Sequence, residues 1–143
     1  MKMQNKRREL SGFSLIELLV VLVILGLLGG LVGPRLFTQV DSSKVDVAQT
    51  QIRMLKSALQ AYRLDNGGYP SDEMGLRALV EKPSQDKKWN GPYLEEMLPA
   101  DPWGKEFIYK FGAANFQGFA LFSLGADGAE GGEGVNEDIG YLP

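Results

Sequence analysis

The strongest constraint on this chain is an apolar run over residues 13–33, in which Glu17 is the only charged side chain. In an α-helix these 21 residues span about 31 Å at about 1.5 Å per residue, which is close to the hydrocarbon thickness of a bilayer. Basic side chains precede the run and give residues 1–12 a net charge of +3, whereas the whole chain carries −3. This asymmetry predicts a membrane helix whose N-terminus stays in the cytoplasm.

Two simpler interpretations of the run are a secretory signal peptide and a plain membrane anchor. The run is longer than the apolar core of a usual signal peptide, and no small-residue cleavage site followed by a loop ends it. A plain anchor leaves Glu17 unexplained, because an ionised carboxylate within a bilayer costs about 2.5–3.5 kcal/mol on insertion scales. We therefore expect Glu17 to have a partner and a role.

Helix-weakening residues crowd the far end of the run: Gly26, Gly29, Gly30, Gly33 and then Pro34. Each glycine weakens a helix by about 1 kcal/mol relative to alanine, and proline removes a backbone hydrogen bond. We expect a kinked or partly melted stretch from Gly29 to Pro34, at least in an assembled state. The alternative is that such residues are simply common in membrane helices.

Residues 36–65 predict a second helical stretch with one apolar face. Apolar side chains recur at spacings of three and four residues, as in an amphipathic helix: Ala48, Ile52, Leu55, Leu59 and Tyr62. Asp65-Asn66-Gly67-Gly68 predicts a glycine-rich helix end. We expect one long helix, with its first half in the membrane and its second half packed on a small domain.

The remaining residues predict a small α+β domain. A short helix capped by Ser71 is expected before Pro83, followed by an ordered loop over residues 83–105, where Pro, Gly, Asn and Asp provide repeated turn signals. Strands of a small antiparallel β-sheet are expected over residues 107–111, 119–124 and 139–142, with a hairpin loop between the first two.

Residues 126–143 form an acidic, glycine-rich end without Lys or Arg. Its carboxylates are Asp127, Glu130, Glu133, Glu137 and Asp138. Hard cations such as Ca²⁺ take about six to eight oxygen ligands, so this composition suits a calcium site. The spacing does not match an EF-hand loop, and from composition alone a solvated acidic terminus is at least as good an interpretation.

Composition also excludes several classes of function. The chain contains no Cys and no His, which rules out disulfides, the common zinc sites and Ser-His-Asp or Cys-His catalysis. Paired carboxylates such as Asp72 and Glu73 have no buried setting that would make them catalytic. The acidic exported part disfavours nucleic-acid binding. We therefore expect neither an enzyme nor a nucleic-acid partner.

The stretch Gly12-Phe13-Ser14-Leu15-Ile16-Glu17 resembles the type IV prepilin signature, in which a basic leader ends in Gly before a Phe and a nearby Glu. The resemblance implies that a prepilin peptidase cuts between Gly12 and Phe13 and methylates the new N-terminus, giving N-methylphenylalanine. It implies that Glu17 pairs with the Phe13 amine of a neighbouring subunit, which would set the register of assembly. We include Pro34 among the assembly residues.

The chain after Phe13 resembles the major pseudopilins of type II secretion, the general secretion pathway protein G family. The matching stretches are "LDNGGYP", "GLRALV", "GPYLEEMLPADPWG" and "FSLGADGAEGGEG" followed by "EDIG". The resemblance implies a type IV pilin-like fold divided into four segments. These are a leader peptide (1–12), a transmembrane and filament-core helix (13–34), an amphipathic helical half (35–66) and a globular periplasmic domain (67–143).

The same resemblance implies a calcium ion in the last loop. The best-matched ligands are Asp127, Asp138 and the backbone carbonyl of Leu124, and weaker matches are Glu137, Asn136 and the carbonyl of Ala129. Many type IV pilins close this loop with a disulfide, which a chain without Cys cannot form. A bound metal would restrict the loop as a cross-link does.

The function implied by the resemblance is that of a structural subunit. It would polymerise with itself into a periplasmic filament that helps to push folded proteins through an outer-membrane secretin. The implied partners are minor pseudopilins, the prepilin peptidase and methyltransferase, and the inner-membrane assembly platform. The implied location is the bacterial inner membrane, in a single pass with the C-terminal domain in the periplasm. The alternative is a true type IV pilin of a surface pilus for adhesion, motility or DNA uptake.

Overall fold

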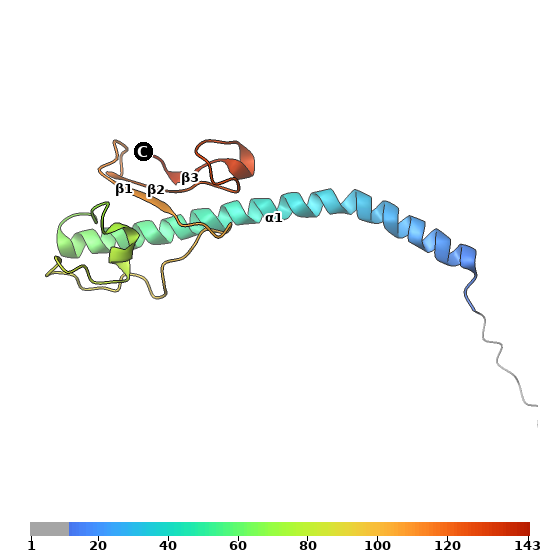
Figure 1. Cartoon of the computed structure of the whole chain (residues 1–143), viewed down its shortest axis with the longest axis horizontal. Coiled ribbons are helices and arrows are strands. Elements are labelled where there is room, and N and C mark those ends of the chain that lie inside the picture. Colours follow the sequence, from blue (N-terminus) through green and yellow to red (C-terminus); the bar gives the residue numbers. More distant parts are fainter. Residues whose placement is uncertain (1–11) are drawn as a thin grey trace, which may run out of the picture. The chain divides into compact units, whose positions relative to one another are not determined.

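A computed structural model of the chain describes the backbone of residues 12–143 and the side chains of all of these except 35–38. The elements in chain order are α1 (Leu15–Asn66), η1 (Gly75–Leu79), β1 (Ile108–Phe111), β2 (Phe119–Ser123), η2 (Gly134–Asn136) and β3 (Ile139–Tyr141). This is the expected α+β arrangement of a long helix and a small antiparallel sheet (Figure 1). The predicted leader lies outside the described residues, apart from Gly12. The chain divides into two compact units, with the boundary between Thr38 and Gln39.

Helix α1 has 52 residues and contains Pro34. Its backbone is helical throughout Gly29–Pro34, so the partly melted stretch expected there is absent from the single chain. A proline removes one backbone hydrogen bond, which does not end a helix whose flanking residues keep theirs. A kinked or melted stretch in an assembly stays a prediction.

The second half of α1 buries the face that the periodicity predicted. Ala48, Ile52, Leu55, Leu59 and Tyr62 are all buried. The helix ends at Asn66 as expected, and Gly67 follows with φ of 83° while its N–H donates to the Arg63 carbonyl at 2.8 Å. This left-handed residue satisfies one of the last free carbonyls of the helix.

The sheet covers this buried face of α1. Its strand order is β1-β2-β3, and both pairings are antiparallel. All five residues of the central strand β2 are buried, and Phe119 and Leu121 join the helix residues in one hydrophobic core with Leu76 and Leu79 of η1. The observed strands agree with the predicted ones to within one residue at each end.

The short helix differs from its prediction. η1 is a 3-10 helix that begins at Gly75, after Met74, and no side chain caps it. Gly75 has φ of 53°, and its N–H donates to the Ser71 carbonyl at 2.9 Å. The predicted cap by the Ser71 side chain is therefore wrong, because η1 begins four residues after Ser71 and Met74 occupies its N-cap position.

The predicted ordered loop over residues 83–105 contains no regular element and is tied down by side chains. Trp89 Nε1 donates to the Ala78 carbonyl at 2.7 Å, and the Tyr62 hydroxyl donates to Asp86. The Tyr93 hydroxyl donates to Asp65 Oδ2 at 2.9 Å. Burial, and then the hydrogen bond to Asp86, raises the pKa of Tyr62 well above its ordinary value, so the hydroxyl stays a donor.

Candidate functional site

The first half of α1 presents an apolar surface that is exposed in the described part of the chain. Residues 15–32 are all exposed, Leu15, Leu22 and Leu31 among them. Within residues 12–143, α1 is the one helix long and apolar enough to cross a membrane by length and composition, and its most apolar 18-residue window has a mean hydropathy of 2.9. A continuous apolar surface of this size marks a contact with lipid or with other protein chains.

Glu17 lies in the first turn of α1 and forms a capping box with Ser14. The Glu17 N–H donates to Ser14 Oγ at 3.2 Å, and the Ser14 N–H donates to Glu17 Oε2 at 3.4 Å. The pattern Ser-x-x-Glu in "SLIE" carries this signal, which our sequence analysis missed. Within the single chain the carboxylate therefore stabilises the start of the helix, next to exposed Gly12 and Phe13. The pairing with a neighbour's amine stays a prediction.

The acidic loop, residues 124–138, joins β2 to β3 and is held by its own backbone. Ala126 N–H donates to the Val135 carbonyl at 2.9 Å, and Asp138 N–H donates to the Gly131 carbonyl at 3.2 Å. At Gly132, whose φ is 83°, an added Cβ would lie 2.3 Å from the Asn136 carbonyl oxygen. Only glycine permits this close approach, so the loop is a folded structure rather than a solvated tail.

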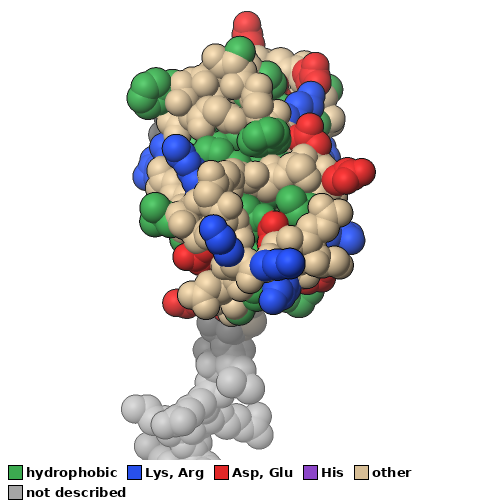
Figure 2. All heavy atoms as spheres, turned by 90° about the vertical axis from the view of Figure 1, so that its left-hand side faces the viewer, with side chains coloured by type: hydrophobic (Ala, Val, Ile, Leu, Met, Phe, Trp, Pro, Cys, Tyr) green, Lys and Arg blue, Asp and Glu red, His purple; other side chains and the backbone are tan. Residues whose placement is uncertain are grey.

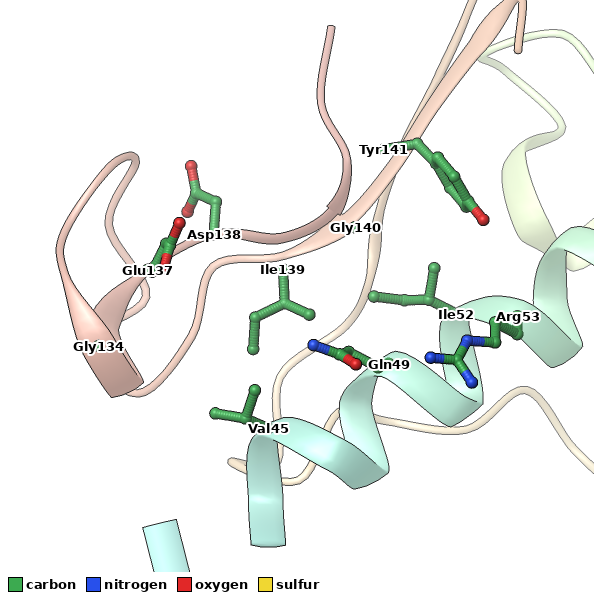
Figure 3. Close-up of a pocket in the computed structure, with 10 residues that line it drawn as sticks. All are labelled: Val45, Gln49, Ile52, Arg53, Gly134, Glu137, Asp138, Ile139, Gly140 and Tyr141. Atoms are coloured by element: carbon green, nitrogen blue, oxygen red, sulfur yellow. The ribbon is translucent and has the colours of Figure 1, made fainter. Parts of the chain in front are cut away.

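Asp138 contributes a carboxylate to the interior of the acidic loop. Its Oδ2 accepts a hydrogen bond from the Gly131 N–H at 3.0 Å, whereas its buried Oδ1 has no hydrogen-bond partner. Figure 3 shows Ile139 pointing toward Val45 and Gln49 of α1, and Asp138 pointing away from the helix. A buried carboxylate oxygen without a donor is costly, and a cation would satisfy it.

The other predicted ligands lie on the same loop, and none of them has a buried carboxylate oxygen that lacks a hydrogen bond. Asp127 is exposed, and its Oδ1 accepts a hydrogen bond from the Ala129 N–H at 3.0 Å. The Leu124 carbonyl accepts one from the Gly128 N–H at 3.3 Å. Glu137 lines a pocket of about 330 Å³ beside α1 together with Asp138 (Figure 3). Asn136 packs its backbone against Gly132.

Carboxylates alone do not complete a metal site here. In the described part of the chain, no three acidic side chains gather closely enough to hold an ion. Backbone carbonyls of the acidic loop would have to supply the remaining oxygens, as is common for Ca²⁺. The donor types present therefore suit a hard cation, and the ligand set stays a prediction.

Lys105 places an ammonium group against the acidic loop from outside it. Its Nζ donates to the Ala126 carbonyl at 3.3 Å, and a Cβ added at Gly128 would lie 2.1 Å from this Nζ. The positive charge therefore already occupies the neighbourhood of the loop carbonyls. The sequence did not predict this contact, because Lys105 is 21 residues away from Ala126 and no spacing pattern connects them.

Asp101 anchors the start of the acidic loop through a buried chain of hydrogen bonds that passes through Ser123. Its Oδ1 accepts hydrogen bonds from the N–H groups of Trp103 at 3.0 Å and Lys105 at 2.8 Å, and its Oδ2 accepts one from the Ser123 hydroxyl at 2.5 Å. Ser123 Oγ in turn accepts from the Gly125 N–H at 3.2 Å. The "DPWG" turn is thus connected to the first glycine of the loop, although the sequence suggested only a turn at Asp101.

Comparisons with protein families match almost the whole chain. Residues 35–142 match the family described as "Type II secretion system (T2SS), protein G". Residues 8–33 match the family described as "Prokaryotic N-terminal methylation motif". The two matches meet close to Pro34, which is where the sequence predicted that the membrane helix ends.

Named relatives agree with these matches over nearly their full length. The chain is 48% identical over 139 residues to the type II secretion system core protein G of Pseudomonas aeruginosa, covering 94% of this chain and 96% of the relative. It is 43% identical over 139 residues to the protein of the same name from Vibrio cholerae, covering 95% and 94%.

A solved structure extends the likeness to the fold. The crystal structure of the major pseudopilin from the type 2 secretion system of enterohaemorrhagic Escherichia coli matches with a TM-score of 0.60 and 35% sequence identity. The match covers 75% of this chain and 93% of the crystallised one. The pilin-like α+β fold expected from the sequence is confirmed, and the relatives favour a type II secretion pseudopilin over a surface pilin.

Proposed function

The chain belongs to the type II secretion system protein G family, and from this we propose that it polymerises through the first half of α1 into a periplasmic filament. In this proposal the filament helps to push folded proteins through the outer-membrane secretin. The role is structural rather than catalytic. The partners are other copies of the chain, minor pseudopilins, the prepilin peptidase and the inner-membrane assembly platform.

The observation that carries the proposal is the uncovered apolar surface of residues 15–32, none of which is buried. Before assembly, lipid would cover this surface, with the N-terminus in the cytoplasm and the domain in the periplasm. In a filament, the same segments of neighbouring copies would cover one another. Contacts between unlike surfaces of identical copies build a fibre rather than a ring when the rotation between copies does not close.

Processing would place a charge where Glu17 can use it. Cleavage between Gly12 and Phe13 creates a positive amine at Phe13. In the structure the Glu17 carboxylate accepts a hydrogen bond from the N–H of the next residue, Ser14. The carboxylate is thus directed toward the N-terminal end of the helix, where a neighbour's methylated amine would meet it. A slipped register would leave both charges unpaired in an apolar setting.

The test uses Glu17→Ala in the full chain, expressed in cells that carry the secretion apparatus. We expect the mature protein to lack residues 1–12 and to carry one added methyl group by mass spectrometry. We expect Glu17→Ala to lose filaments in electron micrographs while the processed subunit accumulates. Asp46→Ala, which removes an exposed carboxylate from the second half of α1, is the matched control and should assemble normally. Normal filaments from Glu17→Ala would contradict the pairing.

The acidic loop supports a proposed calcium site. Asp138 Oδ1 is buried without a donor, and the same loop carries the carboxylate of Asp127 and the backbone carbonyls of Leu124 and Ala129. Asn136 and Glu137 are the outer candidates. A bound ion would cross-link the two arms of the loop and so stabilise the folded domain.

The family's relation to surface pilins gives the alternative function, in which long fibres would extend outside the cell. The high coverage of the core protein G relatives favours the pseudopilus. Electron microscopy at native expression separates the two, since a pseudopilus should give no long surface fibres and a pilin should give many.

A further inference from the structure

We propose that the tip of the β1–β2 hairpin on one copy docks, with Phe116 as its anchor, into an apolar groove between α1 and residues 93–99 of a second copy. The inference rests on the proposed function, because it requires that copies assemble. It adds a contact between domains to the contacts proposed for the first half of α1.

The anchor is unusually exposed. Phe116 lies at the tip of the hairpin that joins Phe111 to Phe119, and its side chain is 100% exposed, the most exposed large apolar side chain in the described part of the chain. An exposed aromatic ring that is held rigidly is typical of residues that anchor protein–protein contacts.

Asn115 holds this tip in place with its whole side chain. Nδ2 donates to the carbonyls of Phe119 at 2.9 Å and Leu142 at 2.6 Å. Oδ1 accepts from the N–H groups of Gln117 at 3.0 Å and Gly118 at 3.1 Å. Both chain neighbours of Phe116 are therefore fixed, so docking would cost little additional ordering of the loop.

The receiving surface, called here the methionine groove, is a pocket of about 730 Å³ on the same domain. Its lining is formed by Met54, Ser57, Ala58 and Ala61 of α1 and by Tyr93, Leu94, Glu95, Glu96, Met97 and Pro99. Met97 is 88% exposed and Met54 is also exposed. Methionine adapts its shape readily, and a pocket of about 300–1,000 Å³ accommodates a group much larger than one aromatic ring.

The methionine groove is formed before any docking, because both ends of its loop are strapped to α1. The Tyr93 hydroxyl donates to Asp65 Oδ2 at 2.9 Å at one end. Gln51 Nε2 donates to the Ala100 carbonyl at 3.1 Å at the other end. A groove built in this way offers an occupant a fixed shape.

A second copy of this chain is the occupant that the geometry favours. Figure 1 shows the sheet and the residues around 83–105 on opposite sides of the second half of α1, so a copy cannot place its own hairpin in its own groove. A contact between two different surfaces of the chain can repeat from copy to copy without closing into a ring, as a filament requires.

Charge supports the same pairing. Glu95 and Glu96 are exposed at the rim of the methionine groove, and Lys110 is exposed on β1 next to the hairpin. Figure 2 shows charged side chains of both signs scattered over one end of the domain, without a surface of single sign. Close pairs of opposite charge, rather than a long-range field, would therefore orient the two copies.

The test exploits the absence of Cys from the chain. Ala114→Cys, an exposed position on the hairpin that leaves Phe116 in place, and Ser57→Cys, an exposed position in the groove lining, are expressed together as full chains in cells that assemble filaments, and a short bismaleimide is added. We expect dimers from the mixture, monomers from either variant alone, and a ladder of multimers from one chain that carries both substitutions. Leu64→Cys replaces Ala114→Cys in the control, since Leu64 is 86% exposed and lines neither surface.

A second measurement does not depend on cross-linking. Phe116→Ser should lower filament yield about tenfold while the melting temperature stays that of the native chain, and Leu64→Ser should leave the yield unchanged. Cross-linking no better than with Leu64→Cys, or full yield from Phe116→Ser, would overturn the docking. If Glu17→Ala abolishes filaments in the same cells while Phe116→Ser does not, the assembly proposal stands and the docking alone fails.

Discussion

Residues 15–32 and residues 48–62 are parts of one helix, yet their apolar side chains lie in opposite environments. In the first segment every side chain is exposed, whereas in the second the side chains of Ala48, Ile52, Leu55, Leu59 and Tyr62 are buried against the sheet and η1. The second segment has polar side chains on its other faces and completes its core within the chain. The first has no such division, because it is apolar on all sides.

The difference shows where the stability of each segment comes from. The domain gains its stability from its own hydrophobic core, so it should respond to core substitutions like any small soluble domain. The side chains of residues 15–32 are all exposed in the described part of the chain, so their substitutions should act on membrane insertion and assembly.

The largest effect should come from the centre of the core. Phe119 is fully buried between Tyr69 and Tyr109, and Phe119→Ala should lower the free energy of unfolding by about 3–5 kcal/mol. Leu22→Ala, in the exposed segment, should change it by less than about 0.5 kcal/mol. Urea titration of the detergent-solubilised chain, followed by fluorescence of Trp89 and Trp103, measures both. A comparable loss from Leu22→Ala would mean that residues 15–32 also contribute to the stability of the domain.

A smaller but clear loss should follow removal of the buried Asp101. This carboxylate is 4% exposed and accepts hydrogen bonds from Trp103, Lys105 and Ser123. Asp101→Ala leaves these donors without their partner, so the free energy of unfolding should fall by about 2–4 kcal/mol. The same urea titration tests this, and the exposed Glu106→Ala is the control. An equal effect from both variants would argue against a stabilising role for the hydrogen bonds of Asp101.

Calcium should stabilise the domain by an intermediate amount. At a free concentration one hundred times the dissociation constant, a ligand stabilises its site by about 2.7 kcal/mol. Chelator should therefore lower the melting temperature, and Asp127→Ala or Asp138→Asn should remove the response. Lys105→Met should enlarge it, because the ammonium that now lies beside the Ala126 carbonyl would no longer repel the ion. A melting temperature indifferent to calcium would reject the site.

The smallest effect should appear at alkaline pH. Burial raises the pKa of Tyr62, Tyr93 and Tyr109 above the ordinary value of 10.0. A raised folded-state pKa means that this stabilisation is complete below about pH 10 and is lost as the pH rises further. Stability should therefore fall above pH 10, and less steeply in Tyr109→Phe. Residues 13–38 contain no tyrosine, so membrane insertion of the apolar segment should show no matching dependence.

Much of the fold was predictable from patterns confined to short stretches of sequence. The buried face of α1, its end at Asn66 and the three strands each follow from a local periodicity or a turn signal. The capping box of Ser14 and Glu17 was also predictable, from the Ser-x-x-Glu pattern, but our sequence analysis did not identify it. The expected Ser71 cap was wrong, since the 3-10 helix begins only at Gly75 and Met74 occupies its N-cap position.

The candidate site was predictable only in part. Its acidic residues stand out in the sequence, and resemblance to a family singled out Asp127 and Asp138. The roles of Asp101 and Lys105 were not visible, because both act on the acidic loop across 21 or more residues of chain. The burial of Asp138 Oδ1 without a hydrogen-bond partner also depends on the folded loop and could not be predicted from the sequence.

The sequence was enough to predict an apolar helix long enough to cross a membrane, a processing signature before it and an acidic, glycine-rich stretch over residues 126–143. These are properties of composition and of neighbouring residues, and they hold before the chain folds. Tertiary structure alone decided which carboxylate is buried, which lysine approaches the loop and where Phe116 stands relative to the methionine groove. Burial and contact between residues far apart in the sequence are set by how the elements pack, and no local pattern encodes them.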